Sequence, residues 1–101
     1  MLRHIVMWDL HDQAEGADKA ENLAKAKALL LTCAQVVPGI RTFEVAHATP
    51  EMDCSHDLVL HMALDDAQVL AAYQNHPDHL AIKPFMKAVV KARRCMDFIV
   101  D

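Results

Sequence analysis

Glycine is scarce in this chain of 101 residues, which contains only Gly16 and Gly39. The sequence therefore has no glycine-rich loop of the kind that binds phosphate, and no Gly-x-Ser-x-Gly turn that would expose a nucleophilic serine. It also lacks any Ser-, Gln- or Gly-rich tract that would form a linker. These absences argue against kinases and serine hydrolases. The length suits one modest core, so we expect a single domain over residues 1–101.

An excess of basic residues is also missing. Ten Lys and Arg stand against 14 Asp and Glu, giving a net charge of −4 that disfavours binding to nucleic acid. No apolar run approaches the length of a membrane span, and the first residues lack the apolar region of a signal peptide. Cys33, Cys54 and Cys95 are odd in number and far apart. We therefore expect a cytoplasmic protein in a reducing compartment, with neither nucleic acid nor membrane as a partner.

Hydrophobic residues, by contrast, make up 53% of the chain. In residues 2–10 the even positions, which include Val6 and Trp8, share one face of a predicted strand. Ile5 and Met7 make the opposite face of that strand apolar as well. So much apolar surface needs cover from outside the chain, and a homodimer is the natural source of it.

The period of the apolar pattern changes several times and predicts both strands and helices. Alternating or continuous apolar runs predict strands at residues 2–10, 40–47, 58–62 and 95–100. Helical spacing after start signals at Asp18 and Asp65–Asp66 predicts one helix over residues 18–37, ended by Pro38–Gly39, and a second from residues 65–66. We expect His76–Pro77 to interrupt the second helix, and Pro84 to split or kink the segment that follows.

This order of elements, βαββαβ, is that of the ferredoxin-like α+β fold. In that fold both helices cover one face of an antiparallel four-stranded sheet. The other face of the sheet has no helix, although residues of strands 2–10 and 58–62 make it apolar. We expect a second copy of the sheet to cover that face in a dimer.

The segment Tyr73-Gln74-Asn75-His76-Pro77-Asp78-His79 holds one phenol and two imidazoles around the predicted bend. His79 shares helical spacing with Ile82 and Met86, so we expect apolar surroundings that keep its imidazole neutral and basic. A neutral imidazole can take a proton from a carbon next to a carbonyl group. The hydroxyl of Tyr73 can donate to the oxygen that gains charge in that step.

Each of these residues also has a structural interpretation. His79 can be a half-buried histidine that donates to a backbone carbonyl, and Tyr73 can be a core residue whose hydroxyl reaches the rim. His76 stands where a helix-capping residue belongs, directly before Pro77. Trp8 can be part of the core or part of a pocket wall.

Asp97 is a carboxylate inside the apolar run 95–100, where an unpaired charge would be costly if buried. A histidine such as His4 or His79 would be a suitable partner and would be oriented by it. The alternatives are an exposed position at a sheet edge or a pair with Arg3. No cluster of His, Cys and Asp has metal-ligand spacing, so we expect no metal site.

Five segments, taken in order along the chain, form a specific set. They are Arg3-His4-Ile5-Val6, Val37-Pro38-Gly39-Ile40 with Phe43-Glu44-Val45, Asp57-Leu58-Val59-Leu60, residues 72–79, and Asp97-Phe98. With these segments the whole chain resembles the stress-responsive A/B barrel domain family, also called Dabb. The resemblance implies a dimeric α+β barrel made from two ferredoxin-like monomers.

The Dabb family includes plant stress proteins and a polyketide cyclase that forms olivetolic acid by aldol cyclisation without cofactor or metal. The resemblance places the essential histidine of that cyclase at His79 and its assisting tyrosine at Tyr73. It places two pocket positions at His4 and Asp97. The aromatic lining that the cyclase draws from its first helix has no equivalent, because residues 23–37 contain no Phe, Tyr or Trp.

Two functions remain open. One is a cofactor-independent enzyme that acts on a small apolar or polyketide-like molecule, with His79, Tyr73 and Asp97 as catalytic residues. The other is a non-enzymatic dimer that binds a ligand or serves in stress tolerance. A third function, that of a cofactor-free oxygenase, is weaker because it rests on fold analogy alone. In either of the first two cases we expect the ligand pocket to be lined by His4, Val6, Trp8, Leu58, Leu60 and His76.

Overall fold

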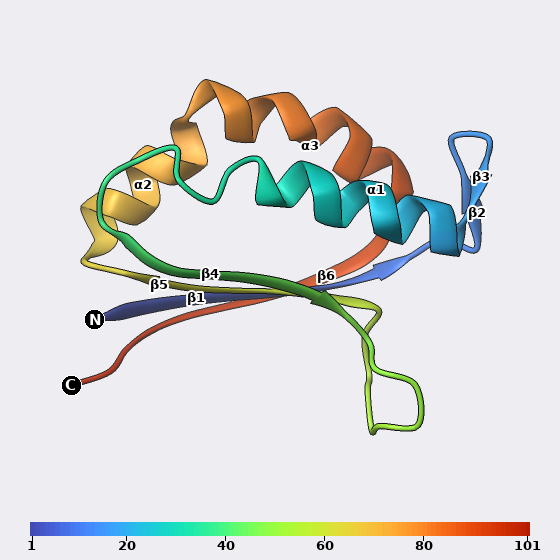
Figure 1. Cartoon of the computed structure of the whole chain (residues 1–101), viewed down its shortest axis with the longest axis horizontal. Helices are drawn as coiled ribbons and strands as arrows, with labels where there is room; N and C mark the ends of the chain where they lie inside the picture. Colours follow the sequence, from blue (N-terminus) through green and yellow to red (C-terminus); the bar gives the residue numbers. More distant parts are fainter.

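The computed structural model describes residues 1–101 and shows a four-stranded sheet with three helices on one face (Figure 1). The strands of the sheet are β1 (Leu2–Leu10), β4 (Ile40–His47), β5 (Leu58–Leu64) and β6 (Val90–Ile99). The helices are α1 (Lys19–Leu31), α2 (Ala67–Asn75) and α3 (Pro77–Val89). A short hairpin of β2 (Gln13–Ala14) and β3 (Ala17–Asp18) precedes α1. None of the helices is long and apolar enough to cross a membrane.

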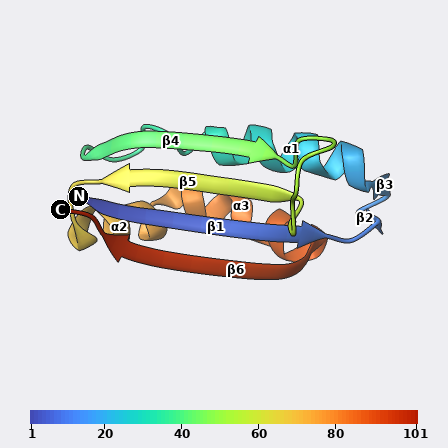
Figure 2. The ribbon, with the colours of Figure 1, turned by 90° about the horizontal axis from the view of Figure 1, so that it is seen from below.

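The strand order in the sheet is β4-β5-β1-β6, and every neighbouring pair is antiparallel. Figure 2 shows this order from the side that carries no helix. The first strand of the chain therefore lies in the middle of the sheet, between the last strand and β5. The predicted ferredoxin-like α+β fold is confirmed.

Alternation along β1 separates the two faces of the sheet. Leu2, Val6 and Leu10 are buried against the helices, as the period-two pattern predicts. Ile5 is only half-buried and Met7 is 36% exposed, because they point to the helix-free face. Within one chain no helix covers this face, which also carries the hydrogen-bonded polar side chains of Arg3, His61 and Glu44.

Local signals start the helices where the sequence places them. Asp18 accepts a hydrogen bond from the backbone N–H of Glu21 at 2.9 Å, and Asp66 accepts one from Val69 at 3.0 Å. Pro77 occupies the first turn of α3, where its missing N–H leaves no intrahelical bond unmade. The predicted break at His76–Pro77 is confirmed, and it turns the chain between α2 and α3.

Two predicted boundaries are wrong, and the split that was one of the two outcomes predicted at Pro84 does not occur. Helix α1 ends at Leu31 rather than at residue 37, because tight i to i−3 bonds at Cys33 and Ala34 replace the helical pattern after it. Strand β6 begins at Val90, directly after α3, and not at Cys95. Pro84 does not split the helix: α3 runs through it from Pro77 to Val89.

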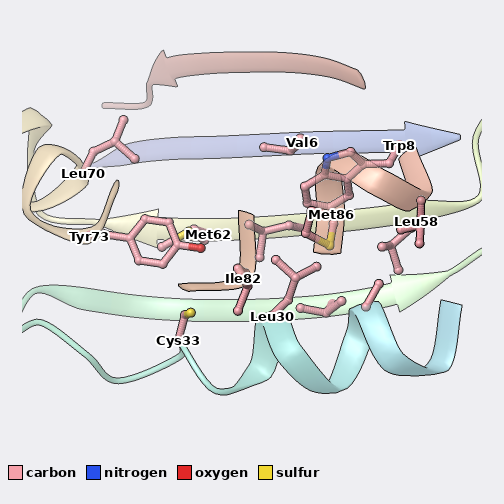
Figure 3. Packing of buried hydrophobic residues seen from close by; sticks show 14 of the residues in the cluster. Val6, Trp8, Leu30, Cys33, Leu58, Met62, Leu70, Tyr73, Ile82 and Met86 are labelled. Atoms are coloured by element: carbon pink, nitrogen blue, oxygen red, sulfur yellow. The ribbon is translucent and has the colours of Figure 1, made fainter. Parts of the chain in front are cut away.

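The core lies between the helices and the sheet. Tyr73 of α2, Leu60 of β5 and Val89 of α3 are each at most 2% exposed and belong to one cluster of buried hydrophobic residues. Figure 3 shows the ring of Tyr73 reaching from α2 toward Met62 and Ile82. The packing thus holds Tyr73 in one place above the sheet.

Gly39 makes the turn into β4 with a φ of +97°, a conformation that L side chains rarely adopt. A Cβ at this position would lie 2.7 Å from Cγ2 of Val69, a stiff β-branched side chain. We expect Gly39→Ala to lower the free energy of unfolding by about 1–3 kcal/mol. Urea unfolding at fixed protein concentration measures the change.

Gly16 provides the matched control, because its φ is +72° but no atom lies within 4 Å of the added Cβ. Gly16→Ala therefore adds backbone strain without a clash, and its cost should be the smaller of the two. Equal midpoints for the two variants would contradict the role of the Val69 contact.

Candidate functional site

A cavity of about 710 Å³ opens between the sheet and helices α2 and α3. Volumes of this size accommodate small organic ligands. Six of the nine site residues predicted from the sequence line it: His4, Val6, Trp8, Leu60, Tyr73 and His79. The structure therefore brings together residues that are up to 75 positions apart along the chain (from position 4 to 79).

His79 lies in the first turn of α3 and presents one ring nitrogen for chemistry. Its Nδ1 lies 3.0 Å from the backbone carbonyl oxygen of Gln74. A carbonyl oxygen only accepts, so Nδ1 carries the proton and donates it, which leaves Nε2 of the neutral ring as an acceptor. Burial lowers the pKa of His79, and the charges of Lys83, His4 and Arg93 add to this effect against the opposing bond to Gln74. The imidazole is thus held neutral at pH 7.

Tyr73 is fully buried beside His79, with their ring centroids 4.6 Å apart. Its hydroxyl has no hydrogen-bond partner in the protein, although the residue lines the cavity. An unpaired buried hydroxyl costs about 1–3 kcal/mol. Desolvation raises the pKa of Tyr73, and the nearby Cys33 raises it further, so the phenol remains a donor. A ligand oxygen that reached this hydroxyl, just below the cavity surface, would satisfy it.

His4 and Asp97 form a hydrogen-bonded pair across β1 and β6, where they are directly opposite in register. His4 is 3% exposed and lines the cavity, whereas the side chain of Asp97 is 39% exposed at the outer strand. Of the three partners considered for Asp97, the structure shows His4 and not His79 or Arg3. Asp97 contacts the cavity only through this imidazole.

Cys95 lies beside the same pair, with its Sγ 3.9 Å from Nδ1 of His4 and 3.7 Å from Oδ1 of Asp97. Burial, followed by the neighbouring Asp97, raises the pKa of the Cys95 thiol. A nitrogen, a sulfur and an oxygen thus lie within 4.8 Å of one another. Spacing along the chain could not show this group, because residues 4 and 95 meet only through the pairing of β1 with β6.

The remaining predicted site residues lie outside the cavity lining. Leu58, the first residue of β5, is buried in the core. His76 caps α3: its Nδ1 accepts a hydrogen bond from the backbone N–H of Asp78 at 3.1 Å. These contacts match the interpretation of His76 as a helix-capping residue.

Three cations that the sequence analysis did not single out also line the cavity: Lys83, Lys87 and Arg93. The signal for two of them was present, since Lys83 and Lys87 follow His79 at steps of four residues along α3. Arg93 lies opposite Trp8 in the β1–β6 pair. The sequence could not predict Arg93 as a lining residue, because it places the start of the last strand at Cys95, whereas β6 begins at Val90.

Comparisons with known proteins agree with this architecture. A protein of Streptomyces coelicolor described as uncharacterized is 32% identical over 81 residues, which cover 80% of this chain and 81% of that protein. A dimeric ferredoxin-like protein of Thermobifida fusca superposes with a TM-score of 0.84 at 19% identity, over 98% of this chain and 90% of that one.

A Dabb family protein of Mesorhizobium loti with a ferredoxin-like fold superposes with a TM-score of 0.69 at 22% identity, covering 99% of this chain and 96% of that one. At such identities the two structural matches show the shared fold alone. The model of the stress responsive A/B barrel domain matches residues 2–100, which is nearly the whole chain. The protein therefore belongs to the stress responsive A/B barrel domain (Dabb) family.

Proposed function

We propose that the cavity binds a small, largely apolar carbonyl compound and that His79 removes a proton from the carbon next to a carbonyl group. The observation that carries this proposal is the pairing, on one cavity wall, of an unpartnered Tyr73 hydroxyl with a neutral His79 whose Nε2 is free. An acceptor nitrogen and a donor hydroxyl side by side are what enolate formation needs.

In the proposed step, Nε2 of His79 takes the proton and the C–H bond breaks. Its electron pair moves through the carbon–carbon bond onto the carbonyl oxygen, which Tyr73 stabilises by donating its hydroxyl proton in a hydrogen bond. The enolate carbon then attacks a second carbonyl carbon of the same molecule and forms the new ring bond. The His79 imidazolium returns its proton to the oxygen of that second carbonyl. The reaction is an intramolecular aldol addition, like that of a polyketide cyclase, and needs no cofactor.

Asp97 has an indirect role in this proposal. Its carboxylate accepts a hydrogen bond from Nδ1 of His4, which directs the other nitrogen of that buried imidazole into the cavity. His4 would then hold a hydroxyl or enol group of the ligand on the wall opposite α3. Asp97 is therefore a positioning residue.

A non-enzymatic, ligand-binding protein is the second candidate. The observation that favours it is the complete burial of Tyr73, at 0% exposure. A hydroxyl fixed below the cavity surface can hydrogen-bond a ligand oxygen, but it has little freedom to move as that oxygen changes geometry during a reaction. The two candidates differ in turnover and not in binding.

We also propose that the protein is a homodimer joined through the helix-free face of the sheet. Met7 and Met96 are 36% and 65% exposed on that face, and Ile5 lies directly opposite Met96. The loop of residues 48–57 extends beyond the sheet on the same side (Figure 1). The similar Thermobifida fusca protein is described as dimeric.

The pH dependence of kcat/KM tests the role of His79 as a base. A base must be unprotonated, and burial places the pKa of His79 below its ordinary value of about 6.5. We therefore expect kcat/KM to rise with pH, to reach its half-maximum below pH 6.5, and to stay level from pH 7 to pH 9. No alkaline decrease is expected there, because burial raises the pKa of Tyr73.

Steady-state rates with linear polyketide thioesters or ketoacids measure this profile. Lys83→Gln removes a positive charge that lowers the pKa of His79, so it should move the acid limb to higher pH. A profile that is level through pH 5 to 9, or that falls between pH 7 and 8, would exclude His79 as the base.

A further inference from the structure

We infer that the ligand carries an anionic group, such as a carboxylate, which Lys83, Lys87 and Arg93 hold at the cavity mouth, one to two helical turns from His79. This inference rests on the proposed function only in taking the cavity as the ligand site. It adds the chemical class of the ligand: an apolar body with a reactive carbonyl group at one end and a negative charge at the other.

The charged side chains that line the cavity are positive, whereas the chain as a whole is negative. The protein has 14 acidic and 10 basic residues, yet no Asp or Glu is among the 15 residues that line the cavity. Three of the ten basic residues are among them. A pocket with this charge in an acidic protein concentrates anions and repels cations.

None of the three cations forms an ion pair with an acidic group of the protein. The Lys and Arg ion pairs of this chain, those with nitrogen and oxygen within 4.0 Å, involve Lys19 and Arg41, and none involves Lys83, Lys87 or Arg93. All three side chains belong to exposed residues at the cavity rim, so their amino and guanidinium groups remain free to bind an anion. An arginine beside two lysines is a common arrangement for carboxylate binding.

The spacing of His79, Lys83 and Lys87 sets the expected distance between the carbonyl group and the anionic group of the ligand. His79, Lys83 and Lys87 follow one another at four-residue steps within α3 and all line the cavity. A helix rises by about 1.5 Å per residue, so Lys83 and Lys87 lie about 6 Å and 12 Å from His79 along the axis. Arg93 lies below them on β6, opposite Trp8. The ligand should therefore separate its carbonyl group and its anionic group by roughly 6–12 Å.

Apolar side chains make up 8 of the 15 lining residues, which matches a largely apolar ligand body. Val6, Leu60, Ile82 and Met86 are all buried and line the cavity. A dissolved anion such as free phosphate would gain nothing from these side chains. The site therefore fits an amphipathic acid better than an inorganic anion.

Two dyes with the same aromatic skeleton test the inference. The anionic probe is 8-anilinonaphthalene-1-sulfonate, and the neutral probe is N-phenyl-1-naphthylamine, which lacks the sulfonate. Trp8 is the only tryptophan and lines the cavity, but the protein extends only 38 × 31 × 18 Å, so energy transfer from Trp8 reports a dye bound anywhere on it; the variants below identify the site. We expect the sulfonate dye to bind more tightly, and more weakly as salt is added.

The variant Lys83→Gln/Lys87→Gln should weaken binding of the sulfonate dye by about three- to tenfold and leave the neutral dye within about twofold. The control Lys27→Gln/Lys91→Gln makes the same change of charge at residues outside the cavity lining. It should leave both dyes unaffected. Arg93→Gln added to the first variant should weaken the sulfonate dye further.

Equal loss in the test and control variants, or equal loss for both dyes, would overturn the inference and leave the proposed chemistry of His79 standing. Charge-dependent binding of the sulfonate dye with full turnover in a His79 variant would support the inference and remove the proposed reaction. Absence of energy transfer from Trp8 with either dye would overturn the assignment of the cavity as a ligand site.

Discussion

Replacing His79 with alanine is expected to lower turnover of a cyclising substrate by about two to four orders of magnitude, the usual contribution of a positioned base. The physical reason is that His79 is the lining imidazole whose ring packs against Tyr73, 4.6 Å between centroids, whereas the other lining imidazole, His4, is paired with Asp97. The measurement is steady-state kinetics with linear polyketide thioesters and ketoacids. The loss should fall on kcat, because the base acts in the transition state and contributes little to ligand binding.

Tyr73→Phe should lower kcat by a smaller factor than His79→Ala, since it removes one hydrogen bond and keeps the buried ring. It should also leave stability almost unchanged or slightly raised, because the hydroxyl has no partner in the ligand-free protein. His11→Ala is the matched control: His11 is exposed and lies outside the cavity lining. An unchanged rate in His79→Ala, with binding retained, would leave ligand binding as the function.

The fold follows from signals that are local in the chain. The even positions of residues 2–10 are buried because period-two alternation places them on one face of a strand. Asp18 starts α1, and Pro77 starts α3, because a side-chain acceptor and a missing N–H each act within one turn of helix. Such effects need no knowledge of the rest of the molecule. They are sufficient here to give the order βαββαβ.

Element ends were harder to predict because they depend on tertiary contacts. The apolar residues Ala34 and Val37 keep helical spacing beyond Leu31, but they belong to the turn that leads to β4. Strand β6 carries Lys91, Arg93 and Arg94, a run that resembles a polar loop. It is a strand because β1 supplies its hydrogen-bonding partner and water solvates its outer edge.

The lining of the cavity was predicted only in part, because it too depends on tertiary contacts. His79 and Tyr73 stand close together in sequence around the bend, so their meeting at the cavity could be predicted. Leu58 and Leu60 have the same parity on β5, but only Leu60 lines the cavity. Leu58 lies directly opposite Trp8, which does line it, and is itself buried in the core cluster. The rim cations were missed because charged residues on a helix are usually solvated. Only the fold shows that the side of α3 carrying Lys83 and Lys87 borders a cavity.

The second prediction with a large expected effect concerns the homodimer. The variant Ile5→Asp/Met96→Asp is expected to convert the proposed homodimer into a monomer, as measured by sedimentation at micromolar concentration. Ile5 and Met96 are directly opposite on β1 and β6 and point to the helix-free face, so each dimer interface would contain the substitution twice. Burying four carboxylates against an apolar sheet costs several kcal/mol, more than a dimer of standard size can absorb.

Leu80→Asp is the matched control for this experiment. Leu80 is 46% exposed on α3, in the helical layer, so the same introduction of charge there should leave the dimer intact. The opposite result, a stable dimer in Ile5→Asp/Met96→Asp and dissociation in Leu80→Asp, would place the interface on the helices. In a dimer joined through the sheets, both cavities and their Lys83, Lys87 and Arg93 rims lie on the helix side, away from the interface. The monomeric variant should therefore still bind the sulfonate dye, and loss of that binding would show that the partner contributes to the site.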